Sequence, residues 1–287
     1  MNHISFMTAN FVARELDYDM PGGWGQGDRA ANSYFRPEET FAERFEALLQ
    51  EIVAMDFDTI DLWLAHLNAQ WATEGQVETA RALLEKYGLA VASLAGWFGE
   101  TQEEFERCCR LAVALDCTVL GGSTSILEKD RGFAVETLRK YQVRLGLENH
   151  PEKTPQVMLE KIGDGADGAI GVTVDTGWFG TQGYDAAQAI RELGSHVVHV
   201  HLKDVLAEGE HETCAYGEGI VPIEDCVRAL QEIGYEGAIS VEHEPEHEDP
   251  KPGVATSRAK LEGWLRSSDR NSEISRGNNE MKGPEHE

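Results

Sequence analysis

The sequence predicts an α/β fold, a single (β/α)8 TIM barrel of parallel strands. Eight short apolar runs alternate with segments of helical spacing, an order typical of parallel strands joined by helices. The chain has 287 residues, which suits one such barrel or two small domains. No GxGxxG or GxxxxGK[ST] run follows an early strand, so a doubly wound nucleotide-binding sheet is the less favoured alternative.

The expected strands are short runs of β-branched and other apolar residues. They cover residues 4–9, 59–65, 89–97, 117–122, 143–149, 170–176, 197–203 and 238–243. In the last four runs, apolar residues alternate with small or polar ones. Successive side chains of a strand point to opposite faces, so each of these strands has one apolar face. In a parallel barrel, helices cover that face and the other face points inward.

The segments between these runs carry helix signals. Apolar residues recur at helical spacing in residues 41–53 and 223–233, which predicts two amphipathic helices. Thr101 followed by Glu104 matches a capping box. Thr154 before Pro155 matches an N-cap with proline at the first helical position.

The chain divides into a barrel over residues 1–266 and a polar tail over residues 267–287. The tail has one isoleucine, one methionine and no aromatic residue. A segment with so little apolar surface to bury does not offset the entropy of ordering, so we expect the tail to be disordered.

Composition and charge exclude several classes of protein. No stretch approaches the ~20 apolar residues of a membrane helix, and the first residues lack the basic and apolar regions of a signal peptide. The five cysteines are odd in number and without CxxC spacing, which favours reduced thiols in a cytoplasmic protein. A formal net charge of −26 weighs against nucleic-acid binding.

Four of the expected strands end with a residue that can bind a metal ion. Each lies on the face opposite its strand's apolar row, so all four point into the barrel. Singly, each acid could equally cap a helix or form a salt bridge; together, three carboxylates and one imidazole indicate one divalent ion. Such a set suits Mn²⁺ best and is compatible with Mg²⁺, Co²⁺ or Zn²⁺. The four candidate ligands are Glu148, Asp175, His201 and Glu242.

The four candidate ligands resemble the metal site of the xylose-isomerase-like TIM barrels, in the sugar phosphate isomerase/epimerase branch. The local sequences that carry the resemblance are ENHPEKT, DTGW, HLKD, GEG and EHEPE. The resemblance covers about residues 3–266. It implies one divalent ion and carbon-skeleton chemistry on a sugar or polyol.

Two positions depart from the family. Trp178 stands where many relatives have a histidine, and His211 and Thr213 stand where the AP endonuclease branch has an Asp-x-His pair. Three zinc ions and DNA cleavage are therefore not expected.

The ligand set also suggests a reaction. A divalent ion can stabilise an enediolate formed when a proton leaves the carbon next to a carbonyl. Glu148 and Glu242 come from strands five and eight, so one could remove a proton and the other deliver it to the opposite face. We therefore expect a metal-dependent isomerase or epimerase of a sugar or a sugar phosphate. The alternatives are an inosose-dehydratase-like lyase, a non-catalytic carbohydrate-binding barrel, and a deglycosylating subunit that works with a partner chain.

Further residues at strand ends are candidates for binding a small carbohydrate or polyol. Histidines and a lysine can hydrogen-bond sugar hydroxyls, and indole rings stack on sugar C–H surfaces. Lys203 could instead pair with a carboxylate, and each tryptophan could equally serve in packing. Whether the chain forms a homo-oligomer stays open. The candidate substrate contacts are His66, Trp97, His150, Trp178, Lys203 and His211.

Overall fold

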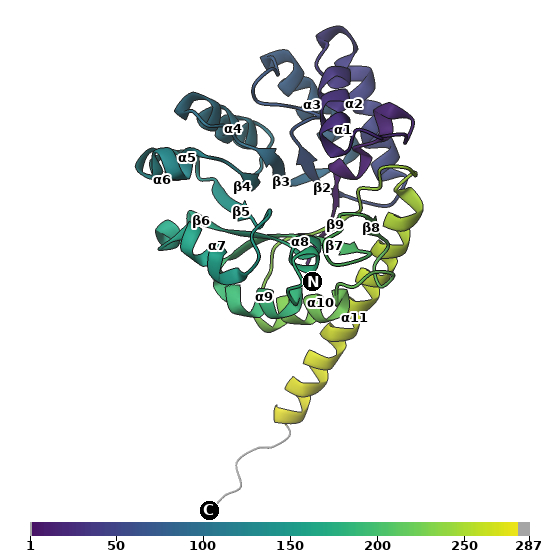
Figure 1. Cartoon of the computed structure of the whole chain (residues 1–287), viewed down its shortest axis with the longest axis vertical. Coiled ribbons are helices and arrows are strands. Elements are labelled where there is room, and N and C mark those ends of the chain that lie inside the picture. The colour runs from purple at the N-terminus through teal and green to yellow at the C-terminus, as the bar shows by residue number, and fades with distance from the viewer. Residues whose placement is uncertain (1, 281–287) are drawn as a thin grey trace, which may run out of the picture.

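The computed structural model describes residues 2–280, with side chains through Ser267. The parallel strands of this part of the chain are β1 (Ile4–Met7), β2 (Thr59–Trp63), β3 (Ala90–Trp97), β4 (Val119–Ser123), β5 (Arg144–Glu148), β6 (Ile170–Asp175), β7 (Val197–Val205) and β9 (Ile239–Glu242). They pair in this order, and β9 pairs back to β1, which closes the barrel. Figure 1 shows the strands at the centre with helices around them. The predicted (β/α)8 barrel is confirmed.

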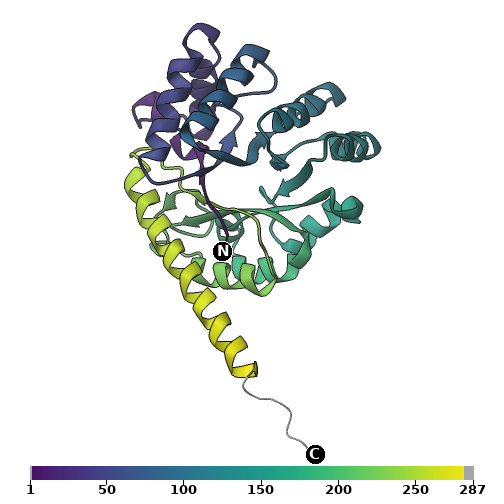
Figure 2. The same ribbon diagram turned by 180° about the vertical axis from the view of Figure 1, so that it is seen from behind.

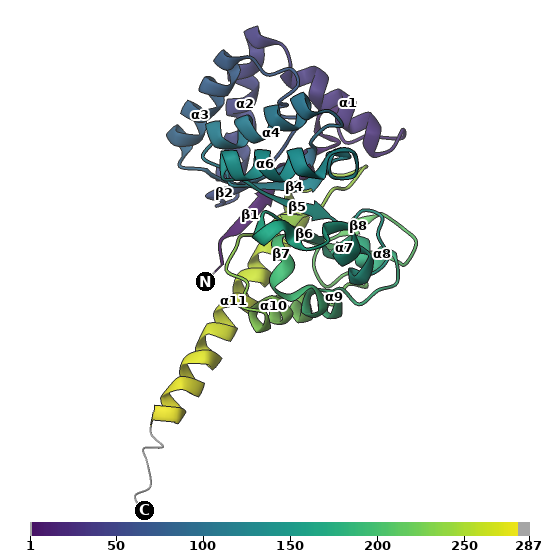
Figure 3. The same ribbon diagram turned by 90° about the vertical axis from the view of Figure 1, so that its left-hand side faces the viewer.

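Helices follow the strands and cover the outside of the barrel. They are α1 (Trp24–Phe35), α2 (Glu38–Val53), α3 (Glu74–Tyr87), α4 (Gln102–Ala114), α5 (Ile126–Lys129), α6 (Arg131–Tyr141), α7 (Pro155–Ile162), α8 (Thr176–Thr181), α9 (Ala186–Leu193), α10 (Ile223–Glu232) and α11 (Lys251–Glu280). Figure 3 shows α2, α3 and α4 above the strands and α9 and α10 below them.

The helix signals read from the sequence are present in the structure. Residues 41–53 lie in α2, where Phe41, Phe45, Leu48, Leu49 and Ile52 are buried, and residues 223–232 form α10, whose apolar face is also buried. Thr101 and Glu104 form the predicted capping box at the start of α4. Thr154 caps α7, with Pro155 in its first turn.

The two faces of the strands meet different surroundings. The outward apolar rows of β5, β6 and β7 are buried in the main core against the helices. The inward faces carry small and polar residues that leave little free space. A Cβ added at Gly146 would lie 2.3 Å from the hydroxyl oxygen of Thr173, so no larger residue fits there without a shift. This division between the faces places polar groups inside the barrel, below the ends of the strands.

Asp204 organises the long segment after β7. Its carboxylate accepts hydrogen bonds from the backbone N–H groups of Gly217, Gly219 and Val221. Within this segment, β8 (Thr213–Cys214) pairs antiparallel with the end of β7. Asp204 thus fixes the C-terminal part of this loop, and Thr181 donates a hydrogen bond to the backbone of Glu210 next to His211.

Helix α11 begins beside the barrel and continues past residue 266, where the sequence predicts the barrel to end. Val254, Leu261 and Leu265 of its first half are buried. Figure 2 shows the second half running away from the barrel. Disorder of residues 267–287 stays a prediction, and residues 281–287 lie outside the described part. Within that part, no helix is long and apolar enough to span a membrane.

Candidate functional site

A cavity of about 560 Å³ opens at the C-terminal ends of the barrel strands. Its polar side consists of residues at and beyond the ends of β5, β6, β7 and β9, and its apolar side of residues from β1, α1, β2 and β3. All four candidate ligands line this cavity. Of the candidate substrate contacts, Trp97, His150, Trp178, Lys203 and His211 line it as well.

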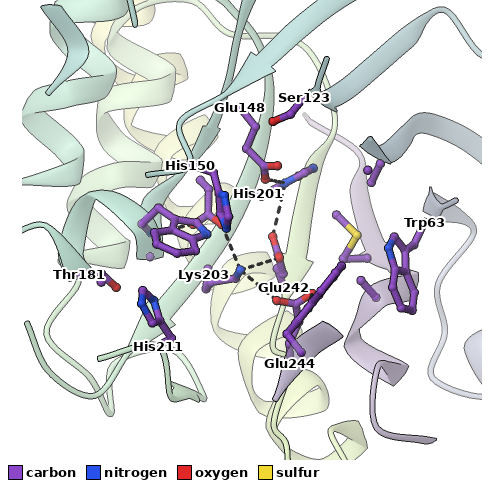
Figure 4. Close-up of a pocket in the computed structure, with 18 of the residues that line it drawn as sticks. Trp63, Ser123, Glu148, His150, Thr181, His201, Lys203, His211, Glu242 and Glu244 are labelled. Carbon is purple, nitrogen blue, oxygen red and sulfur yellow. Dashed lines mark hydrogen bonds and ion pairs between the residues drawn. The ribbon is translucent and has the colours of Figure 1, made fainter. Parts of the chain in front are cut away.

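Glu148, His201 and Glu242 form a tight cluster on the polar side, shown in Figure 4. Nδ1 of His201 lies 2.6 Å from an oxygen of Glu148 and 3.5 Å from an oxygen of Glu242. One ligand atom from each residue lies within 4.8 Å of the others. Burial alone would lower the pKa of His201, but the two carboxylates raise it well above its usual value.

The donor set of this cluster fits a divalent ion. It offers two carboxylates and one imidazole nitrogen, which are ligands of Mn²⁺, Mg²⁺ and Zn²⁺ in proteins. Oε2 of Glu242 is buried and has no hydrogen-bond partner among the described residues. Buried carboxylate oxygens are normally satisfied, so an unsatisfied one facing a histidine indicates a place for a cation.

Asp175 lies beside this cluster and has other contacts. One carboxylate oxygen accepts a hydrogen bond from the backbone N–H of Trp178, which caps α8. The other lies 3.0 Å from Nζ of Lys203. Asn149 holds the backbone of Asp175 in place through two hydrogen bonds. Desolvation by burial raises the pKa of the Asp175 carboxyl. The structure thus places Asp175 in the cavity but outside the three-residue cluster.

Lys203 brings a buried positive charge into the site. Its Nζ lies 2.7 Å from Glu242 and 3.1 Å from Glu244, in addition to its contact with Asp175. Burial would lower the pKa of Lys203, but these carboxylates raise it well above its usual value. The stem of Lys203 packs against Gly177 of the DTGW sequence, where an added Cβ would lie 2.6 Å from Cγ. Pairing with carboxylates is therefore what the lysine does in this structure.

Three aromatic side chains form a continuous group on the polar side. The ring centroids of His150 and Trp178 lie 3.8 Å apart, and those of Trp178 and His211 lie 4.4 Å apart. Trp97 stands on the apolar side with 52% of its surface exposed. These four residues are positioned to touch a bound molecule, and their role stays a prediction.

His66 is placed differently from the other candidate substrate contacts. It is 1% exposed and does not line the cavity. Its ring contacts Phe35 and Trp63, and Nδ1 lies 3.0 Å from the hydroxyl of Thr8. Desolvation by burial lowers its pKa to about 3. The position three residues after β2 suggests a residue of the barrel mouth, but the chain turns there, and the ring of His66 packs against Trp63 and Phe35.

Asp61 is part of the site and was not among the residues expected from the sequence. It is buried in β2, and its Oδ2 lies 2.5 Å from Nε2 of His199 and 3.5 Å from Nε2 of His201. Its Oδ1 accepts a hydrogen bond from the hydroxyl of Ser5. Burial would raise the pKa of Asp61, and the two histidines lower it. Asp61 could have been found from its place between Ile60 and Leu62, the alternation used for the four candidate ligands.

Glu244 and Trp63 also line the cavity and were not expected. Glu244 lies two residues beyond the end of β9 and accepts a hydrogen bond from Nε1 of Trp24. Trp63 ends β2, and its ring centroid lies 5.2 Å from that of Trp24. No periodic signal in the sequence places Trp24, which is the first residue of α1.

The comparisons with known proteins agree with this architecture. The family model described as xylose isomerase-like TIM barrel matches residues 49–268. The chain belongs to the xylose isomerase-like TIM barrel family. A D-psicose 3-epimerase of Enterocloster bolteae is 23% identical over 245 residues, covering 71% of this chain and 78% of that protein. An uncharacterised protein of Methanocaldococcus jannaschii is 32% identical over 117 residues, and this match spans 40% of its length and 38% of this chain.

Solved structures of other xylose isomerase-like barrels share the fold. The structure of an L-ribulose 3-epimerase aligns with a TM-score of 0.69 at 17% identity, covering 96% of this chain and 98% of that one. A xylose isomerase-like TIM barrel protein of Mycobacterium smegmatis in complex with magnesium aligns with a TM-score of 0.68 at 19% identity. This match covers 93% of this chain and 97% of that one. At these identities the likeness establishes the fold alone.

Proposed function

We propose that the protein is a sugar isomerase or epimerase that depends on a divalent metal ion and transfers a proton at a carbon next to a carbonyl. The observation that carries the proposal is the cluster of Glu148, His201 and Glu242 at the base of a cavity large enough for a sugar. The D-psicose 3-epimerase relative supports the reaction type.

Glu148, His201 and Glu242 would hold the metal ion, and Asp175 would complete the set if its carboxylate turned from Lys203. We propose Mn²⁺, because the set is rich in oxygen and has one imidazole. The relative in complex with magnesium supports a divalent ion of this kind. When bound, such an ion supplies Lewis-acid stabilisation of negative charge on the sugar oxygens.

Glu148 and Glu242 are placed to move the proton. They come from β5 and β9 and approach Nδ1 of His201 from two sides. Burial raises the pKa of Glu242 well above its usual value. Burial also opposes ionisation of Glu148, but His201 holds its pKa below the usual value. Without a bound ion, these opposite shifts favour Glu148 as the base and Glu242 as the acid, and we propose these roles for the reaction.

Lys203 and the aromatic group would orient the sugar. The ammonium of Lys203 is paired with three carboxylates, so it could donate a hydrogen bond to a hydroxyl or carbonyl oxygen once Asp175 turned from it to the metal ion. The indole of Trp178 lines the same cavity and could contact the C–H surface of a sugar. A sugar bound between them would have its reacting carbon above the cluster.

The proposal is tested by isotope exchange on the manganese-loaded protein. A panel of ketohexoses and inososes is incubated in deuterium oxide and followed by NMR. Deuterium entering a carbon next to the carbonyl, with an isomeric product, supports the proposal, whereas loss of water shows a dehydratase. No exchange with any compound, in a protein that binds metal and sugar, would argue for a non-catalytic carbohydrate-binding barrel.

Variants of the two glutamates test their separate roles. General acid–base groups supply ~10² to 10⁴ in rate, so Glu148→Gln and Glu242→Gln are each expected to lose at least that factor. Glu242→Gln should still exchange the first proton with solvent, and Glu148→Gln should not. Glu160→Gln changes an exposed carboxylate on α7, outside the cavity, and serves as the control. Near-normal turnover in both active-site variants would show that the glutamates only bind the metal.

A further inference from the structure

We propose that the cavity binds an uncharged sugar carrying an apolar substituent, with the substituent lying against an aromatic wall. This wall consists of Met7, Trp24, Trp63 and Trp97. The inference rests on the proposed function, because the sugar ring is taken to lie over the cluster of Glu148, His201 and Glu242. It adds the chemical class of the substrate.

Trp63 of the aromatic wall lies across the cavity from the cluster, and Trp24 of the same wall reaches Glu244. Figure 4 shows Trp63 on one side, with His150 and His211 on the other and Glu242 between them. The wall comes from the ends of β1, β2 and β3 and from the start of α1, a different half of the barrel from the polar residues. A molecule that spans the cavity therefore meets charged groups at one end and indole rings at the other.

Two tryptophans of the aromatic wall keep a large part of their surface in contact with solvent. Trp24 is 42% exposed and Trp97 is 52% exposed, whereas Trp63 behind them is 3% exposed. Trp24 is held by its hydrogen bond to Glu244 and by its ring contact with Trp63. Exposed indoles that are held in place at a cavity mouth can gain apolar contact when a ligand covers them.

The size of the cavity leaves room for more than one sugar ring. Its volume of about 560 Å³ lies within the ~300 to 1,000 Å³ typical of sites for drug-sized ligands, which have more atoms than a monosaccharide. A single ring placed over the cluster would leave the aromatic wall uncovered. A glycoside with an apolar aglycone and a keto group on its ring would occupy both ends of the cavity and keep the carbonyl that the proposed proton transfer needs.

The charges around the cavity disfavour anionic substrates. Among the described residues that line it, Lys203 is the only lysine or arginine, and three carboxylates surround its ammonium. Five carboxylates line the same cavity, so it stays negative even with a divalent ion bound. Phosphate would be repelled, and no lysine or arginine among the described lining residues is free of carboxylates to bind it. These carboxylates belong to Glu148, Asp175, Glu242, Glu244 and Glu246.

Calorimetric titration of the manganese-loaded protein tests the proposal. Phenyl and methyl glycosides of glucose, galactose, mannose and xylose are compared in pairs, together with the 6-phosphates of the hexoses. In at least one pair, the phenyl compound is expected to bind about tenfold tighter than the methyl compound, and no phosphate should bind tighter than its parent sugar. Equal binding in every pair, absence of binding by all of the glycosides, or preference for a phosphate, would overturn the proposal.

Variants test whether the aromatic wall causes the preference for phenyl over methyl glycosides. Trp97→Ala should reduce the phenyl preference about threefold to tenfold, the range for one aromatic contact. Val113→Ala shortens an apolar side chain that is 46% exposed on α4, outside the cavity, and should leave the preference unchanged. A preference that survives in Trp97→Ala and Trp24→Ala would show that the aglycone binds elsewhere. If the preference is found but no sugar exchanges deuterium, the proposed reaction fails and the binding inference stands.

Discussion

The ammonium nitrogen of Lys203 lies 2.7 Å from a carboxylate oxygen of Glu242, and both side chains are almost fully buried. Asp175 and Glu244 place further carboxylate oxygens within 3.1 Å of the same nitrogen. The lysine therefore compensates negative charge in the half of the cavity that also contains the candidate ligands. Its charge and that of a bound cation act on the same carboxylates.

Lys203→Met is expected to destabilise the metal-free protein. Removing one partner of a buried ion pair costs ~3 to 5 kcal/mol, because the remaining charges are left uncompensated. Mn²⁺ should restore part of this loss by supplying positive charge. Urea unfolding in chelator and in Mn²⁺ measures both effects. Lys129→Met breaks an exposed pair with Glu100 and is the control, with an expected cost of at most ~1 kcal/mol. Equal losses in the two variants would contradict the prediction.

Loss of a cluster residue is expected to weaken metal binding. Glu148→Gln, His201→Ala and Glu242→Gln should each lower the affinity for Mn²⁺ at least tenfold in calorimetry, because each removes one donor of the compact set. Asp175→Asn should have a smaller effect, since its carboxylate faces Lys203. The barrel should stay folded without metal because its core is large. Unchanged affinity in all three cluster variants would place the metal elsewhere.

Asp61→Asn is expected to weaken Mn²⁺ binding by about 10- to 100-fold without contacting the ion. Asp61 lies 3.5 Å from Nε2 of His201, so it can hold the proton there and leave Nδ1 free to bind metal. Ser5→Ala removes only the hydrogen bond to the other oxygen of Asp61 and should have less effect. Melting temperatures of both variants separate loss of folding from loss of affinity. Full affinity in a folded Asp61→Asn protein would show that the contact is purely structural.

His66 should make the fold less stable in mild acid. Burial lowers its folded-state pKa to about 3 from a usual value of 6.5, so only the unfolded chain takes up the proton between these values. The contribution of neutral His66 to the free energy of unfolding is complete above pH 6.5. It decreases by ~1.4 kcal/mol per pH unit as the pH falls from 6.5 toward 3. Urea unfolding at pH 7 and pH 5 should show a smaller difference in His66→Gln than in the unchanged protein. The same difference in both would exclude His66 as the source.

Ending the chain after Ser267 is expected to leave folding intact. The buried residues of α11, such as Leu261 and Leu265, lie before this point. The melting temperature should fall by less than ~5 °C, a change that corresponds to ~2 kcal/mol in a chain of this length. A larger drop, or loss of turnover, would show that residues after 267 dock on the protein.

Much of the fold could be predicted from the sequence because the signals are local. The alternation of apolar residues located the strands, and side chains such as Thr101 and Thr154 marked helix starts. The candidate ligands were found in the same way, since a polar residue opposite an apolar row must point into a closed barrel. His66 was predicted to contact the substrate in the same way, but it lies in a turn after β2. The alternation of faces along a strand does not apply in a turn, so the direction of its side chain could not be predicted.

The sequence by itself determined the barrel, its polar interior and the side chains that reach the cavity, because strand periodicity fixes the direction of each side chain. Only the tertiary structure decided which of these side chains meet. Lys203 paired with Asp175 and Glu242, and Asp61 was brought beside His201 from a strand far away in the sequence. Distances across a barrel depend on strand stagger and on the packing of distant segments, which no local pattern contains.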